Sequence, residues 1–256
     1  MFEVECMARA ELEALQLERL KKIVAWADEK SSFYQKSFRS HGVAPEEIKT
    51  LDDLSKLPFL TREELHSVDA QDFLTLPLSS VVRVSELGGV KKFYTRGDIR
   101  NDVELTARGL MSLNILRGTT VGLAGDLSDG RLLDALYALE SIGATVVLGG
   151  EKIFDCDVLI SARPFGLSVV KNFSERKTFE LFAPPEIGHA GLLCPCEFGF
   201  HVQEDNFLAE ILDGELVLTT LTVQALPLLR YRTGHAAEKI SAPCPCGRTF
   251  TRILIE

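Results

Sequence analysis

The sequence lacks any apolar run near the roughly 20 residues that a helix needs to cross a bilayer. Its first residues also lack the basic-then-apolar order of a signal peptide, so we expect a cytoplasmic protein with no membrane partner. No basic block occurs in a chain whose 37 acidic residues outnumber 28 lysines and arginines, which argues against a nucleic-acid partner. These absences do not decide whether the protein is an enzyme, a small-molecule binder or an interaction protein.

The chain has 256 residues, 46% of them hydrophobic, which is enough for a large core. Apolar residues at helical spacing over residues 8–30 predict an amphipathic helix. Thr61 followed by Glu64 has the spacing of a capping box, which marks the start of another helix. We therefore predict a helical N-terminal arm over residues 1–70.

Helical and strand patterns alternate from about Asp98 onward. The expected helices are 98–116, 131–142 and a short one at 169–173, and the expected strands are 119–124, 145–148, 157–162 and 178–182. Gly118 and Gly143 stand where helix C-caps need a left-handed residue. This alternation predicts an α/β body over residues 71–190, with a mostly parallel sheet covered by helices.

After about residue 190 the pattern changes to short strands without helices between them. The expected strands are 200–202, 207–212, 215–221, 228–233 and 250–255, and Asp213-Gly214 is a hairpin turn signal. We predict a β-rich lobe over residues 191–256, antiparallel in part and packed on the body. The fold class is therefore α/β with a small β-rich lobe.

Four of the six cysteines form two Cys-Pro-Cys triplets, at 194–196 and 244–246. In a reducing cytoplasm, paired thiols hold metal more often than they form disulfides. Cys196, His201, Cys244 and Cys246 make a closed tetrahedral set, which predicts a structural zinc. The alternatives are a four-thiolate site with Cys194 in place of His201, or two incidental turns.

Two further segments carry weaker signals for ligand binding. The run 85–92 contains Gly88 and Gly89 followed by lysines, as a phosphate loop does, but Glu86 would repel phosphate. Read alone, this run is better explained as a surface turn. Glu186, which follows two prolines, faces either a cleft or solvent, and nothing local decides between them.

Several long motifs fill residues 196–253: Cys196–Asp205, Gly214–Thr222, Ala225–Gly234 and Cys244–Thr249. Together with Leu17–Leu65, they resemble the phenylacetate–coenzyme A ligase family. The resemblance also favours His201 over Cys194 as the metal ligand. It implies an adenylate-forming enzyme, which activates a carboxylate with ATP and Mg²⁺ and passes the acyl group from AMP to coenzyme A. It further implies a large domain of α/β layers with a β lobe.

Three departures from the family pattern lie where ATP would bind. The phosphate loop keeps Ser85, Gly88, Gly89 and Lys91 but loses a threonine pair. Only Glu186, the implied Mg²⁺ and adenylate contact, remains of a Tyr-Gly-x-Thr-Glu motif. Thr233 and Gly234 are kept, but His235 replaces the Asp that holds the ribose. The resemblance also implies a shortened middle segment and the absence of the family's mobile C-terminal catalytic domain.

We therefore predict a degenerate relative, inactive as a ligase by itself. Its expected function is to bind a small carboxylate, an acyl-CoA or a protein partner, either a second copy or a full-length ligase. The alternatives are an adenylate-forming enzyme that needs a separate chain for the missing domain, and a scaffolding protein without a ligand. We expect any ligand in the crevice between body and lobe. The residues expected to line it are Ser85, Gly88, Gly89 and Lys91 on one side, and Glu186 and His235 on the other.

Overall fold

A computed structural model describes residues 1–149, 155–164, 166–171, 177–194, 196 and 199–255. The helices are α1 Arg9–Lys30, α2 Ser32–His41, α3 Arg62–Ser67, α4 Ala70–Phe73, α5 Arg96–Ser112 and α6 Gly130–Ile142. The strands are β1 Arg83–Leu87, β2 Val90–Tyr94, β3 Thr120–Ala124, β4 Thr145–Leu148, β5 Val158–Arg163, β6 Gly166–Lys171, β7 Lys177–Phe182, β8 Gly191–Leu193, β9 Phe200–Val202, β10 Phe207–Leu212, β11 Glu215–Thr220, β12 Tyr231–Ile240 and β13 Arg252–Ile255. Short 3₁₀ turns occur at Glu3–Cys6, Pro45–Glu47, Asp52–Lys56 and Leu78–Ser80.

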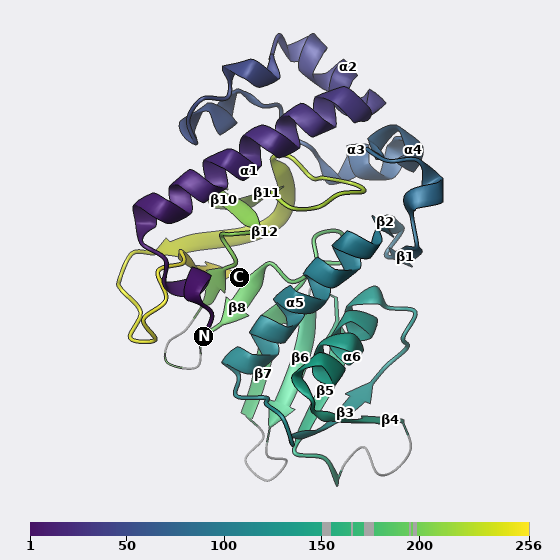
Figure 1. Cartoon of the computed structure of the whole chain (residues 1–256), viewed down its shortest axis with the longest axis vertical. Coiled ribbons are helices and arrows are strands. Elements are labelled where there is room, and N and C mark those ends of the chain that lie inside the picture. The colour runs from purple at the N-terminus through teal and green to yellow at the C-terminus, as the bar shows by residue number, and fades with distance from the viewer. Residues whose placement is uncertain (150–154, 165, 172–176, 195, 197–198, 256) are drawn as a thin grey trace.

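The N-terminal helices pack on the β-rich lobe, where α1 runs along the sheet (Figure 1). Leu20 and Val24 of α1 share one hydrophobic cluster with Leu218 and Tyr231 of the lobe. Gln16, fully buried on the same helix, donates to the Glu204 backbone oxygen at 2.9 Å. Burial of this apolar face, rather than helix propensity alone, holds the arm in place.

The body contains a five-stranded sheet in the order β4-β3-β5-β6-β7. β3 pairs in parallel with β4 and β5, whereas β5–β6 and β6–β7 are antiparallel. The sheet is therefore mixed rather than mostly parallel. The prediction of a short helix at 169–173 is wrong for residues 169–171, because these residues lie in β6. Residues 172 and 173 lie outside the described residues. Because Arg163 pairs directly with Gly166, no crossover helix fits between β5 and β6.

Helices α5 and α6 lie side by side on one face of this sheet and form a second hydrophobic cluster with it (Figure 1). Thr95 and Asp98 form a capping box at the start of α5, as Thr61 and Glu64 do at α3. Gly143 caps α6 in the left-handed conformation, as expected. Gly118 does not cap a helix, because α5 already ends at Ser112.

The lobe is a six-stranded sheet in the order β10-β11-β12-β13-β9-β8, with antiparallel pairing throughout its registers. Asp213 and Gly214 have φ of 52° and 80° and close the β10–β11 hairpin, as the sequence predicts. The strand expected at 228–233 begins only at Tyr231 and continues to Ile240. Within the described part of the chain, no helix is both long and apolar enough to cross a bilayer.

Candidate functional site

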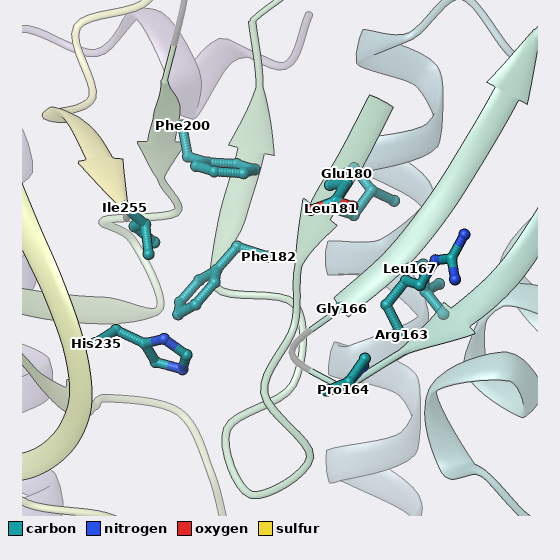
Figure 2. A pocket seen from close by; sticks show the side chains of 10 residues that line it. All are labelled: Arg163, Pro164, Gly166, Leu167, Glu180, Leu181, Phe182, Phe200, His235 and Ile255. Atoms are coloured by element: carbon teal, nitrogen blue, oxygen red, sulfur yellow. The ribbon is translucent and has the colours of Figure 1, made fainter. Parts of the chain in front are cut away.

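Two neighbouring cavities border the body, one where it meets the lobe and the other where it meets the N-terminal arm. The smaller, of about 280 Å³, lies between β7 of the body and residues of β9, β12 and β13 (Figure 2). The larger, of about 530 Å³, reaches the β1–β2 turn, the start of α6 and Glu186. Arg163 and Pro164 line both cavities. The two cavities are therefore adjacent, on either side of these residues.

The aromatic wall of the smaller cavity comes from both sheets. Phe182 at the end of β7 and His235 on β12 point toward one another, with ring centroids 5.4 Å apart in an edge-to-face arrangement (Figure 2). Phe200 on β9 lies 6.1 Å from Phe182, centroid to centroid. Such a wall suits a flat, apolar ring.

Glu186 lies at the wall of the larger cavity and is 8% exposed. The Tyr231 hydroxyl donates a hydrogen bond to its carboxylate at 2.8 Å. Burial raises the pKa of Tyr231, and the nearby Glu186 charge raises it further, so the phenol keeps its proton. Burial lowers the pKa of His235, although Glu186 opposes that shift. Glu186 thus faces a cleft, which the sequence could not decide.

The segment before α3 brings another cation to the crevice. Leu60 forms a parallel bridge with Tyr231, and its amide donates to the Arg230 oxygen at 3.1 Å. Two residues later Arg62 lines the larger cavity. Its positive charge opposes the rise in the pKa of Tyr231 and adds to the lowering of the pKa of His235. Nothing near Arg62 in the sequence signals β12 as its neighbour, so this residue is recognised only in the folded structure.

The run 85–92 forms a tight hairpin rather than an open phosphate loop. Leu87 pairs with Val90, so Gly88 and Gly89 are a two-residue turn with φ of 60° and 79°. Gly88 lines the larger cavity. Ser85 instead contacts the Tyr94 hydroxyl at 3.2 Å.

The two lysines of this hairpin have different environments. Lys91 is exposed and pairs in register with Glu86. Lys92 is buried, and its ammonium lies 2.7 Å from a carboxylate oxygen of Asp102 on α5. Burial lowers the pKa of Lys92, but the Asp102 charge outweighs it and the pKa is raised, so the ion pair persists.

Thr233 and Gly234 hold β12 against β11. The Thr233 hydroxyl donates to the Leu216 oxygen at 2.7 Å, and the Gly234 amide donates to the Glu215 carboxylate at 3.0 Å. Both residues therefore stabilise the pairing of β12 with β11, and this pairing positions His235 at the cavity. The sequence placed them in the site by resemblance alone.

A separate cluster at the end of the lobe could hold a metal ion. The ligand atoms of Cys194, His201, Cys244 and Cys246 all lie within 4.8 Å of one another. Three thiols and one imidazole match the donor set of a closed tetrahedral zinc site. The His201 Nδ1 atom lies 2.9 Å from the Phe250 backbone oxygen, which leaves Nε2 toward Cys246 at 3.4 Å.

The structure places Cys194 in this cluster together with His201, whereas the sequence analysis chose Cys196 and considered Cys194 only in place of His201. Leu192 pairs with His201 across β8 and β9. Cys194 directly follows the last residue of β8 and therefore lies close to this pair. Cys196 is exposed and lies outside the cluster.

Comparisons with known proteins give relatives of one kind. No protein-family model matches the sequence. Proteins from Thermus thermophilus and Escherichia coli are 28% and 27% identical to it, over 98% of this chain and 71% and 72% of theirs. A protein from Aromatoleum evansii is 28% identical over 90% of this chain and 67% of its own. All are phenylacetate–coenzyme A ligases.

The homologues of this chain are phenylacetate–coenzyme A ligases. The resemblance expected from the motifs is thereby confirmed over nearly the whole chain. The match to the Thermus thermophilus ligase runs over 315 positions, more than this chain has residues. That ligase therefore has extra residues within the matched region.

Solved structures of a 2-hydroxyisobutyryl-CoA ligase share the fold of this relative of the phenylacetate–coenzyme A ligases. The open conformation, in complex with 2-HIB-AMP and CoA, superposes with a TM-score of 0.77 at 18% identity, over 97% of this chain and 70% of that one. The postadenylation state with 2-HIB-AMP gives 0.76 at 17% identity, over 97% and 68%. The predicted adenylate-forming-enzyme fold is therefore confirmed.

Proposed function

We propose that this chain activates a carboxylic acid with ATP and takes part in coenzyme A ligation. The observation that carries the proposal is its homology to phenylacetate–coenzyme A ligases over 89–98% of its length. This homology favours the enzymatic hypothesis from the sequence over the pseudoenzyme. The crevice supports it too, because the one acid kept from the family motif, Glu186, lines a cavity beside Arg62 and Gly88.

The reaction divides into two balanced steps. A carboxylate oxygen of the acid attacks the α-phosphorus of ATP, and the bond to the β-phosphate breaks to release pyrophosphate. The coenzyme A thiol then gives up its proton and attacks the acyl carbon, releasing AMP. In this assignment Glu186, positioned by the Tyr231 hydroxyl, supplies a carboxylate for Mg²⁺ on the phosphates. Phe182 and His235 form the apolar wall for a ring of the ligand.

Acid-dependent exchange of pyrophosphate into ATP tests the first step alone. Aryl and short fatty acids are supplied with ATP, Mg²⁺ and labelled pyrophosphate, and at least one acid should give exchange above the acid-free blank. Glu186→Gln should lower that exchange by about 10²–10³-fold, the usual loss for one preorganised electrostatic group. Glu140→Gln on exposed helix surface is the matched control. No exchange with any acid would contradict the proposal.

A second candidate is a binding protein that has lost ligation. Its specific support is Lys92, which the Asp102 ion pair removes from ligand contact, together with His235 where the family has an Asp. A binding protein would show no exchange, yet ATP, AMP, coenzyme A or an acyl-CoA would raise its melting temperature. At 100 times the dissociation constant a ligand adds about 2.7 kcal/mol, which a thermal-shift measurement detects.

We also propose that Cys194, His201, Cys244 and Cys246 bind one structural zinc. The donor set and the Phe250 contact to the far nitrogen of His201 support this choice of metal. A zinc there would join the end of β8 and strand β9 to the Cys244–Cys246 turn before β13. Its contribution would be to stability, because four protein ligands leave no open position for substrate.

A further inference from the structure

The hairpin that corresponds to the phosphate loop presents no lysine ammonium to the larger cavity among its described contacts. Lys92 forms an ion pair with Asp102 and also donates a hydrogen bond to the Ile187 backbone oxygen at 3.0 Å. Lys91 is exposed and stands opposite Glu86 in the hairpin register. What the hairpin does bring to the cavity is the apolar Leu87 and the bare backbone of Gly88. A negatively charged ligand there needs its cations from elsewhere.

Arg62 supplies one of them, from the first residue of α3. Its terminal nitrogen lies 3.9 Å from where a Cβ on Gly88 would stand, so the guanidinium is beside the turn. It is exposed, and no carboxylate in the described part of the chain forms an ion pair with it.

Arg163 supplies the other, from the last residue of β5. It lines both cavities, and its guanidinium points away from the Phe182–His235 ring pair (Figure 2). It too is exposed and, among the described residues, without an ion-pair partner. The larger cavity therefore has one uncompensated arginine from the N-terminal arm and one from the body.

The remaining charges of this cavity are already balanced or held by hydrogen bonds. Arg131 is paired with Asp129 at 2.7 Å and also donates to the Pro164 and Ala183 oxygens. Glu186 accepts from Tyr231. Arg62 and Arg163 are thus the two cations of the lining that have no carboxylate partner in the described structure.

We propose that Arg62 and Arg163 together bind the phosphoanhydride of the ligand, in place of the lysine of a phosphate loop. This rests on the proposed function. Guanidinium groups bind phosphate oxygens in bidentate fashion, and the three arginines of the lining outnumber its two acids, Asp129 and Glu186. ATP and coenzyme A both contain a phosphoanhydride, so the same pair would take either.

Equilibrium binding of inorganic pyrophosphate, ATP and coenzyme A, measured by calorimetry in low salt, tests this assignment. Arg62→Ala and Arg163→Ala should each weaken binding of at least one of the three about 10-fold, and the double variant about 100-fold. Arg39→Ala, an exposed arginine of α2, is the matched control and should change nothing. Unchanged circular dichroism and melting temperature would exclude misfolding.

The three probes separate the two sources of phosphoanhydride. Loss for pyrophosphate and ATP assigns the pair to the nucleotide, and loss for coenzyme A alone assigns it to the thiol substrate; both outcomes support the proposal. Variants that bind all three like wild type, or a wild-type protein that binds none, would overturn it. Absence of acid-dependent exchange with retained arginine-dependent pyrophosphate binding would refute the proposed function and leave this inference standing.

Discussion

Lys92 on β2 and Asp102 on α5 form an ion pair of 2.7 Å in which both side chains are less than a tenth exposed. The same ammonium donates to the Ile187 oxygen, one residue after Glu186. A single cation thus joins the hairpin, the first helix of the body and the segment that carries the retained acid. Glu186 itself accepts a hydrogen bond from the Tyr231 hydroxyl, so the body and the lobe both contact this segment.

Lys92→Met should destabilise the protein by about 3–5 kcal/mol, because it leaves the Asp102 carboxylate buried without its partner. Replacing both residues, Lys92→Met with Asp102→Leu, should recover most of that loss, since no buried charge then remains. Denaturant unfolding of the single and double variants measures the coupling. Lys91→Met on the exposed face of the same hairpin is the control. Equal losses in the single and double variants would contradict the prediction.

Gly188→Ala should destabilise more than Gly214→Ala, although both glycines have positive φ, 92° and 80°. A Cβ at Gly188 would lie 2.8 Å from Lys92 Nζ, whereas nothing lies within 4 Å of one at Gly214. Both variants carry the backbone strain of about 1 kcal/mol or more, and only Gly188→Ala also disturbs the ion pair. Thermal unfolding compares them, and equal melting temperatures would show that the Lys92 contact adds nothing.

His189 should make the protein less stable as the pH falls below about 6.5. Burial, together with Lys92 and Arg131, lowers the pKa of His189 to about 3. Asp129 opposes this shift, and His189 Nε2 has no hydrogen-bond partner among the described residues. Above pH 6.5 the imidazole is neutral in both states. Below it only the unfolded chain takes up the proton, so the free energy of unfolding decreases.

His189→Gln, which cannot titrate, should therefore lose about 2 kcal/mol less than wild type between pH 7 and pH 5. Urea unfolding at the two pH values gives this difference directly. His41→Gln on the surface of α2 should keep the wild-type pH dependence. A His189→Gln curve parallel to wild type would show that the buried imidazole does not govern acid stability.

Cys194→Ala should reduce zinc from about one ion per chain and lower the melting temperature, whereas Cys196→Ala should do neither. Loss of each kcal/mol corresponds to about 2–4 °C for a chain of this size. Cys196 is the control because it is exposed and adjacent in sequence yet outside the cluster. Metal analysis and thermal unfolding check both. Loss of zinc in Cys196→Ala alone would restore the ligand set expected from the sequence.

Local signals in the sequence were enough for elements whose geometry is decided within a few residues. The capping box of Thr61 and Glu64, the Asp213-Gly214 turn and strands such as Thr145–Leu148 occur as predicted. Each depends on a side chain that bonds a nearby backbone group, on a required positive φ, or on a short apolar run. Of the site residues that the family resemblance implied, Gly88 and Glu186 line the larger cavity and His235 lines the smaller one.

The tertiary structure decided what depends on register and on distant partners. Residues 169–171 became a strand because Arg163 pairs with Gly166 and folds β6 back on β5. Cys194 rather than Cys196 joined His201 because Cys194 directly follows β8, which pairs with β9 at His201. Lys92 pairs with Asp102 of α5, and the Leu60–Tyr231 bridge lies two residues before Arg62, which lines the larger cavity. The sequence carries these residues, but their neighbours exist only once separate segments have packed together.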